Sequence, residues 1–284
     1  MSAMASAWDP GRVRRQVDRL RDLPALPGIV ERIVAVLEQP EGDLAEAAAL
    51  VETDQVLTAQ VLRIANSAFY GLSGRIGSVR HALTVLGTTV SRSLVYATAV
   101  LDLRIGLSGF WEHAVGTAVM AGALARHLGL DKPEEVSGAG LLHDLGKVVL
   151  FRQAPEAFAA VLADARAHGR TFRESERALL GTDHAQIASW LMTRWRFPLR
   201  LSEPVVQHHE PGHAKAVPVE TAVVHAANTL VRAYGYGCGG DARIPPVAPA
   251  AWALLGLGRA DLHAVFDAFE RDLAVAHVAI APEH

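Results

Sequence analysis

The sequence predicts an all-α fold, and three observations support that prediction. Apolar residues recur at offsets of three and four along most of the chain, which is the spacing of one helix face. Proline or glycine follows several of these stretches, where helices commonly end. No stretch of strand length alternates regularly between apolar and polar residues. We therefore expect a two-lobed helical bundle.

The first lobe is expected to contain four helices. The stretch "IVERIVAVLEQP" should end as a helix at Pro40, and "DLAEAAALVETD" should form the next one. "TAQVLRIANSAFYG" and "SVRHALTVLG" should form two more, ending at Gly71 and Gly87, because glycine is common just after a helix. Their apolar stripes include Ile29, Ile33, Leu44, Ala48, Val61, Ala65, Val79 and Leu83.

Changes in composition divide the chain into four parts. We expect an N-terminal extension at 1–22, a helical lobe at 23–105, a second helical lobe at 106–236, and a loop with C-terminal helices at 237–284. The second lobe contains most of the histidines. The C-terminal part carries an apolar stripe that is expected to pack on the first lobe, with a homodimer contact as the alternative. That stripe consists of Leu262, Val265, Phe266, Phe269 and Leu273.

Composition excludes several classes of protein. Half of the residues are apolar and 20% are charged, which is typical of a folded globular chain. A net charge of −3 provides no electrostatic footprint for nucleic acid. The single cysteine, Cys238, excludes an internal disulfide and a thiolate metal site. No signal-peptide core and no apolar run of about 18 residues is present, so we expect a cytoplasmic protein of bacterial type without a membrane segment.

Five histidines and one aspartate form a candidate metal constellation. Neutral imidazole is the commonest metal ligand, and a carboxylate can bridge two cations. Neighbouring helical side chains point about 100° apart, so a histidine–aspartate pair on one helix can share an ion only near the helix surface. Ligands from other helices would then complete a bundle-core site. The six residues are His113, His143, Asp144, His184, His208 and His209.

Each of these residues also has an ordinary structural interpretation. His113 could bridge helices, and the pair His208 and His209 could be one core and one surface histidine. Lys147, one helical turn after Asp144, could be an exposed charge. The remaining histidines, including His225, show no grouping. The order and spacing of the set, taken together, favour the metal interpretation.

The segment "LLHDLGK" resembles the core motif of the HD superfamily of metal-dependent phosphohydrolases, and most of all its HD-GYP branch, which hydrolyses cyclic dinucleotides. The resemblance implies that the six residues above are metal ligands, that Asp144 bridges, and that Lys147 contacts substrate phosphate. Two departures count against catalysis. Asn228, in "AVVHAANTLVRAYG", stands where the family has its last aspartate ligand, and "PGHAKAVP" lacks the GYP signature.

The first lobe identifies a narrower family. The "LPALP" start, the "LTAQVLRIANSAFYG" helix and the "ALTVLG" helix occur in the order of an HDOD domain, the HD-related output domain of bacterial signalling proteins. The resemblance extends from about Leu23 to about Ala276. HDOD domains are regarded as regulatory or interaction modules that often lack part of the metal set. Asn66 and Ser67 fall in the family's most characteristic motif and are expected to fix the lobe through hydrogen bonds.

Three functions remain open from the sequence. The favoured one is a regulatory module that binds signalling proteins or a nucleotide second messenger and receives its input from outside the chain. The second is a metal-dependent phosphodiesterase acting on a nucleotide or cyclic dinucleotide, with Asp144 and Lys147 as catalytic residues. The third is an inactive module in which metal fixes the fold. One or two divalent ions are expected, and histidine with carboxylate suits iron, manganese, nickel or zinc.

Overall fold

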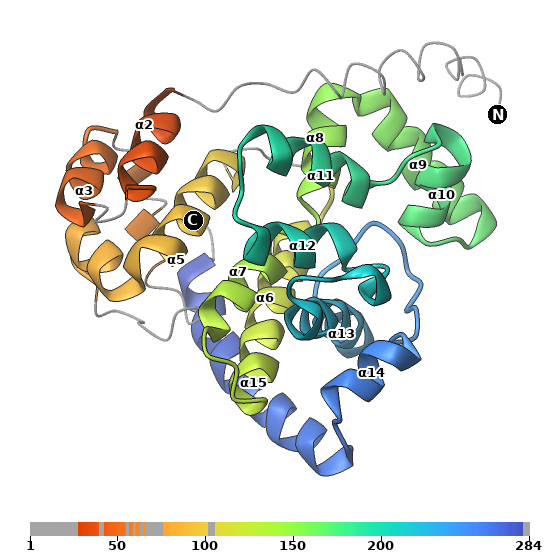
Figure 1. Cartoon of the computed structure of the whole chain (residues 1–284). Helices are drawn as coiled ribbons and strands as arrows, with labels where there is room; N and C mark the ends of the chain where they lie inside the picture. Colours follow the sequence, from red (N-terminus) through yellow and green to blue (C-terminus); the bar gives the residue numbers. More distant parts are fainter. Residues whose placement is uncertain are drawn as a thin grey trace.

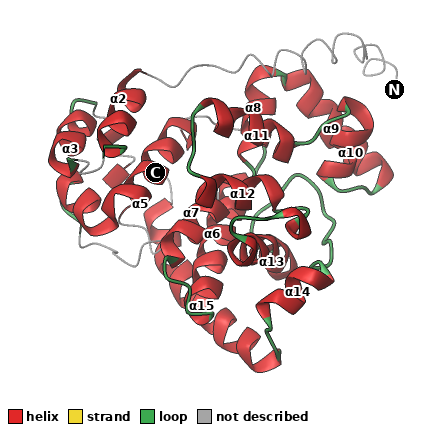
Figure 2. Ribbon diagram, viewed as in Figure 1, coloured by secondary structure: helices red, strands yellow, loops and turns green. Residues whose placement is uncertain are grey.

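The computed structural model describes residues 28–39, 43–54, 57–58, 61–62, 65, 76–101 and 106–280. Within this part of the chain the regular elements are all helical, which confirms the predicted all-α class (Figures 1 and 2). The expectations for 1–22, Pro40, Asn66, Ser67 and Gly71 fall outside the described residues. No described helix is both long and apolar enough to cross a membrane.

The helices of the described part of the chain are arranged as Figure 1 shows. In chain order they are α2 (Gly28–Leu37), α3 (Leu44–Glu52), α5 (Val79–Leu101), α6 (Phe110–His127), α7 (Pro133–Leu142), α8 (Leu145–Gln153), α9 (Pro155–His168), α10 (Phe172–Leu180), α11 (His184–Arg194), α12 (Leu199–Gln207), the 3-10 helix η2 (Pro211–His213), α13 (Pro218–Tyr234), α14 (Pro249–Leu255) and α15 (Arg259–Ile280).

Local sequence explains several helix ends. Asp43 caps α3 by accepting hydrogen bonds from the backbone N–H groups of Ala45 and Glu46 at 2.8 and 3.0 Å. Thr171 and Glu174 form a capping box at the start of α10. Gly87 ends the first helical segment of α5, as predicted. Its backbone is non-helical, with φ 74° and ψ 172°, and a second helical segment follows this kink and continues to Leu101.

Helix α6 forms the centre of the second lobe. Nearly all of its residues from Phe110 to Ala125 are buried, as expected of a helix surrounded by protein. It packs against α7, α13 and α15. Among the described residues, the C-terminal stripe packs mainly on the second lobe and not, as expected, on the first. Val265, Phe269 and Leu273 are buried on α15, which packs along α6. The four predicted domain boundaries stay predictions.

Candidate metal centre

The histidine–aspartate pair lies at a junction between two helices. His143 follows the last residue of α7, and Asp144, with φ −96° and ψ 14°, directly precedes α8. The expectation that both residues sit on one helix is wrong, because the backbone turns here. Gly146 permits the turn to approach α11: a side chain there would start 1.8 Å from the carbonyl oxygen of His184. The turn thus brings Asp144 next to the start of α11.

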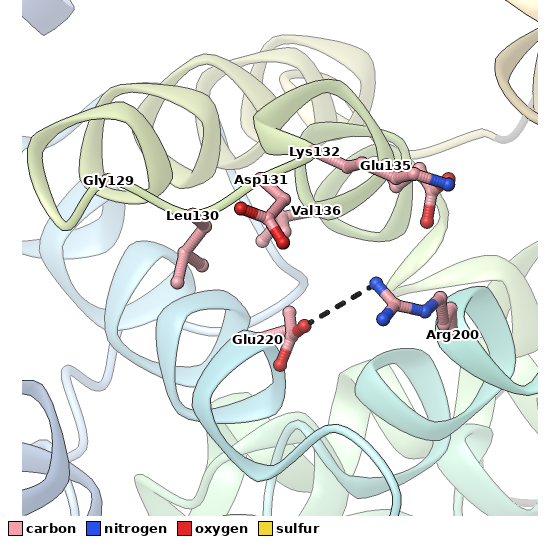
Figure 3. A pocket seen from close by; sticks show the side chains of 8 residues that line it. All are labelled: Gly129, Leu130, Asp131, Lys132, Glu135, Val136, Arg200 and Glu220. Atoms are coloured by element: carbon pink, nitrogen blue, oxygen red, sulfur yellow. Dashed lines mark ion pairs between the residues drawn. The ribbon is translucent and has the colours of Figure 1, made fainter.

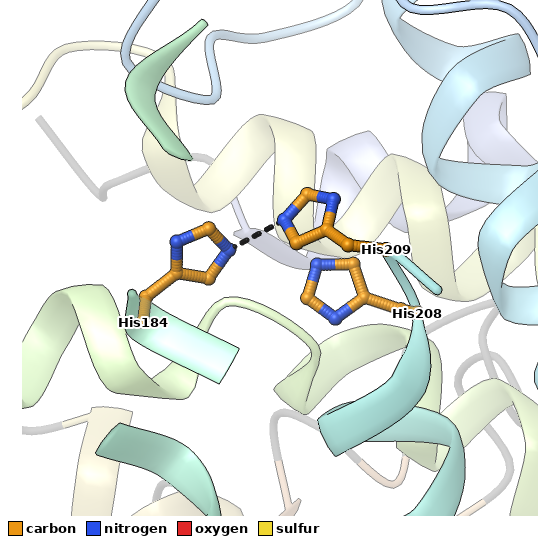
Figure 4. Close-up of side chains that lie close together, drawn as sticks. All are labelled: His184, His208 and His209. Carbon is orange, nitrogen blue, oxygen red and sulfur yellow. Dashed lines mark hydrogen bonds between the residues drawn. The ribbon is translucent and has the colours of Figure 1, made fainter. Parts of the chain in front are cut away.

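The other predicted ligands come from three further elements. His113 lies in the first turn of α6, His184 is the first residue of α11, and His208 and His209 directly follow α12. Together with the junction they form two groups, each with ligand atoms within 4.8 Å of one another. The groups are His113 with His143 and Asp144, and His184 with His208 and His209 (Figure 4). The structure therefore brings together all six residues of the predicted constellation.

Hydrogen bonds at Nδ1 fix the orientation of three of these imidazoles. His143 Nδ1 lies 2.8 Å from the carbonyl oxygen of Gly140, and His208 Nδ1 lies 2.7 Å from that of Val205. His184 Nδ1 lies 2.6 Å from a carboxylate oxygen of Glu176. Because a carbonyl or carboxylate oxygen only accepts, each Nδ1 carries the proton, and Nε2 of each neutral ring presents a lone pair.

The Nε2 atoms converge in pairs. His113 Nε2 and His143 Nε2 are 3.2 Å apart, and His184 Nε2 and His209 Nε2 are 2.8 Å apart. Two nitrogens bound to one ion at bond lengths of about 2.0–2.1 Å lie about 2.8–3.4 Å apart, depending on the angle between the two bonds. Figure 4 shows the rings of the second group facing one another. Such spacing is suited to shared metal coordination.

Asp144 lies between the two groups. One carboxylate oxygen is 3.4 Å from His143 Nε2, and the other is 3.2 Å from His184 Nε2. The buried Nε2 of His208 has no hydrogen-bond partner among the described residues. An orphaned lone pair in the interior is costly unless a cation or proton donor meets it. The donor set and its geometry therefore fit one or two divalent ions.

The protonation states also suit metal binding. Burial lowers the pKa of three of the histidines well below the ordinary value; these are His113, His208 and His209. Burial would raise the pKa of Asp144, but His143 and Lys147 lower it well below the ordinary value. His184 differs from the other three: burial lowers its pKa, but the carboxylates of Glu176 and Asp144 together raise it above the ordinary value. Neutral imidazoles and an ionised carboxylate are the forms that bind metal.

Lys147 is enclosed rather than presented to solvent. Its Nζ donates to Asp144 Oδ2 and to the carbonyl oxygen of Gly239, each at 2.7 Å, and its side chain is 3% exposed. Gly239 belongs to the segment 237–241, which we call the glycine loop. A bound phosphate would have to compete with both of these contacts.

The glycine loop is packed tightly on α6. Gly237 has φ +74°, and a side chain there would start 2.2 Å from the backbone nitrogen of His113. Cys238 N–H donates to the carbonyl oxygen of Gly109 at 2.8 Å. Asp241 then anchors the loop by pairing with Arg232 and by accepting from the Phe172 N–H at 2.8 Å. The loop closes one side of the site, beside His113 and Lys147.

Two residues that support the cluster were not predicted from the sequence. His225 donates from Nδ1 to the carbonyl oxygen of His208 at 2.6 Å, and its Nε2 accepts from the Ala248 N–H at 2.8 Å. The second of these residues is Glu176, whose carboxylate accepts the hydrogen bond from His184 Nδ1. Asn228, one turn after His225, is buried, and its side-chain oxygen has no hydrogen-bond partner among the described residues. Its role as a ligand stays a prediction.

A surface pocket lies at the opposite end of α7 and α12 from the histidine cluster. This surface pocket has a cavity volume of about 180 Å³ and is lined by charged side chains. Lys132 pairs with Glu135 at 3.0 Å, and Arg200 lies 3.9 Å from Glu220 (Figure 3). The pocket contains none of the predicted site residues; its lining is Gly129, Leu130, Asp131, Lys132, Glu135, Val136, Arg200 and Glu220.

Comparison with known proteins identifies the family. The model of the HDOD domain matches residues 23–211, two thirds of the chain. This chain belongs to the HDOD family. Its fold is similar to that of an HDOD domain protein of unknown function from Geobacter sulfurreducens, with a TM-score of 0.73 and 26% identity, covering 96% of this chain and 100% of the other.

Two further proteins are similar to this HDOD chain. One is a candidate signal-transduction protein from Marinobacter aquaeolei VT8, with a TM-score of 0.71 and 24% identity, covering 96% of this chain and 66% of the other. The second is an uncharacterized protein of Treponema pallidum (strain Nichols), 26% identical over 221 residues, or 75% of this chain. The match spans 43% of the length of that curated relative.

Proposed function

We propose that this HDOD chain is a signal-transduction module that acts by binding a partner protein or a nucleotide second messenger, and that its histidine cluster holds one or two divalent ions. The closed state of the site is the observation that carries this proposal. The metal-ligand geometry is present, but the side chain of Lys147 is 3% exposed and occupied by Asp144 and Gly239. A site arranged for ions and closed to phosphate suits a regulatory role better than turnover.

In this proposal the ions tie separate helices together. His113, His143 and Asp144 would hold one ion, and His184, His208 and His209 would hold the other. These ligands come from α6, the α7–α8 junction, α11 and the end of α12, so each ion would join two of these parts. Asp144, which lies between the two groups, would link the two pairs. Iron, manganese, nickel and zinc all match the ligand chemistry. Partner binding would then depend on the metal-fixed arrangement of these helices.

The test combines metal content with turnover. The untagged chain, which avoids the ligands of a histidine tag, is loaded with each ion and assayed with a cyclic dinucleotide and with bis(p-nitrophenyl) phosphate. We expect bound metal and no turnover above that of the free ion. Turnover that disappears in both His143→Ala and Asp144→Ala would overturn the regulatory proposal, because each change removes a metal ligand.

The second candidate is a metal-dependent phosphodiesterase, and the position of Lys147 favours it. Its ammonium group lies 2.7 Å from the central carboxylate, where it could neutralise phosphate charge. When bound, the ions would supply Lewis-acid activation and a nucleophile at neutral pH. Lys147 would first have to leave Gly239. Asp241→Ala, which removes an anchor of the glycine loop, should therefore create turnover under this candidate and none under the regulatory proposal.

A further inference from the structure

Glu176 is a buried carboxylate for which the proposed function has no role so far. It lies in α10, its side chain is 0% exposed, and its Oε2 is 2.6 Å from His184 Nδ1. We propose that Glu176 is a positioning residue that makes His184 a strong metal ligand and supplies, from outside the ligand set, the negative charge that Asn228 lacks. This inference rests on the proposed metal binding and deepens it.

The distribution of charge between the two groups supports this role. The first group contains the carboxylate of Asp144, whereas the second consists of three histidines and has no carboxylate of its own. The family resemblance places an aspartate where this chain has Asn228, so the site lacks one expected anion. Glu176 contacts the second group through His184. It therefore adds negative charge to a group whose one nearby carboxylate, that of Asp144, is shared with the first group.

The hydrogen bond of His184 differs from those of its neighbours. His143 and His208 donate from Nδ1 to neutral backbone carbonyls, but His184 donates to a carboxylate. A charged acceptor makes a stronger bond, fixes the proton on Nδ1 and increases the basicity of Nε2. Arrangements of carboxylate, histidine and metal commonly tune metal sites in this way. His184 should consequently be the strongest nitrogen donor in its group.

The surroundings of Glu176 offer little other compensation for its charge. Among the described residues, His184 is the hydrogen-bond partner of its carboxylate, and the second oxygen, Oε1, has none. The nearby buried cation, Lys147, is already paired with Asp144. His184 could balance this charge only as an imidazolium, which cannot bind metal through Nε2. With His184 neutral, the buried carboxylate lacks that cation and is costly. A divalent ion on the opposite side of the His184 ring would compensate it.

Ion pairs also tie helix α10 to the residues that flank the second group. Arg173 and Arg177 each donate to Asp183, the residue before His184, at 2.8 Å. They also each donate to Glu210, the residue after His209, at 2.6 and 3.0 Å. Positions 173, 176 and 177 share one helix face, so the same clamp that joins α10 to the ligands directs Glu176 at His184. Such a clamp is expected where a ligand must keep its orientation.

The test compares Glu176→Gln with Glu174→Gln. Glutamine keeps the shape and an accepting oxygen but removes the charge, and Glu174 is an exposed capping residue on the same helix. Dissociation constants for Mn²⁺ and Zn²⁺ are measured on the untagged full chain by chelator competition. We expect Glu176→Gln to weaken one bound ion by roughly 10- to 100-fold and Glu174→Gln to leave both unchanged. Unchanged affinity in a folded Glu176→Gln protein would overturn the inference.

A measurement on the unaltered chain covers the case in which Glu176→Gln does not fold. Long-range ¹H–¹⁵N NMR of the Zn²⁺-loaded protein should show His184 protonated at Nδ1 and bound to zinc at Nε2. Protonation at Nε2 would overturn the inference. If the unaltered chain binds none of Fe²⁺, Mn²⁺, Ni²⁺ and Zn²⁺, the proposed metal binding itself fails, and that outcome is distinct from metal binding that does not depend on Glu176.

Discussion

The histidine cluster and the 180 Å³ pocket lie at opposite ends of two of the same helices, α7 and α12. In the pocket, Lys132 and Arg200 are about half exposed and pair with carboxylates. In the cluster, buried Nε2 atoms lie 3.2 and 2.8 Å from one another, and the Nε2 of His208 has no hydrogen-bond partner among the described residues. Charges that pair near solvent need no further ligand, whereas a buried lone pair without a partner does. This difference is our main reason for placing metal at one end and not the other.

Removing the central carboxylate should have the largest effect. Asp144→Ala leaves Lys147 buried without its partner and should lower the free energy of unfolding by about 3 kcal/mol in chelator-treated protein. It should also abolish metal binding in both groups. Glu220→Ala, at the pocket end, removes a partly exposed pair and should cost less than about 1 kcal/mol. Urea unfolding measures both, and equal costs would remove the contrast between the two regions.

Disturbing the glycine loop should have the next largest effect. Gly237→Ala places a methyl group 2.2 Å from the backbone nitrogen of His113, so the loop should shift and bound metal should escape to a chelator several-fold faster. Gly235→Ala is the matched control, because Gly235 has φ +79° but open space around it. Both changes carry the backbone penalty of about 1 kcal/mol. If both release metal at the same rate, the loop does not cover the site.

Restoring the missing acid should have a moderate effect. Asn228→Asp adds a negative charge on α13 and should raise metal affinity about tenfold, because the attraction between a carboxylate and a cation is large in a buried site. Chelator competition measures the change. An unchanged affinity would show that Asn228 does not lie beside the ions. The proposed role of Glu176 toward the second group would then stand without any contribution from position 228.

The smallest effect is expected at the start of α13, near the pocket. Burial would raise the pKa of Glu203, but N–H donors from Lys215, Ala216 and Val217 lower it below the ordinary value. The contribution of the Glu203 carboxylate to the free energy of unfolding is therefore fully present above its pKa in the unfolded chain, about 4.3. It is lost as the pH falls through the lower pKa of the folded state. Glu203→Gln should cost about 1 kcal/mol at pH 7 and less near pH 3. Urea unfolding at pH 7 and at pH 3 measures this cost. An equal cost at the two pH values would contradict the prediction.

The sequence predicted the helical class and the family because both depend on local patterns. Apolar spacing and the order of motifs are readable without knowing which elements touch. The convergence of the histidines was predicted from their order, and the described geometry brings them together; their metal role stays a prediction. The supporting contacts were not predictable. Glu176 meets His184 and His225 meets His208 only after helices pack, and nothing in their sequence neighbourhoods marks them.

Local reasoning succeeded at Gly87, where a helical segment ends as expected, but it failed between α7 and α8. The turn at His143 and Asp144 replaces the single helix that was expected. That departure matters for the site, because the junction is what allows Asp144 to face both groups.

The metal content of the chain tests the central claim most directly. The untagged protein is incubated with Fe²⁺, Mn²⁺, Ni²⁺ or Zn²⁺, desalted and analysed for bound metal beside His143→Ala and His184→Ala. The account predicts one or two ions per chain with at least one of these metals, and the loss of bound metal in each variant. A chain that retains none of the four metals, with a thermal midpoint unchanged by any of them, would contradict it.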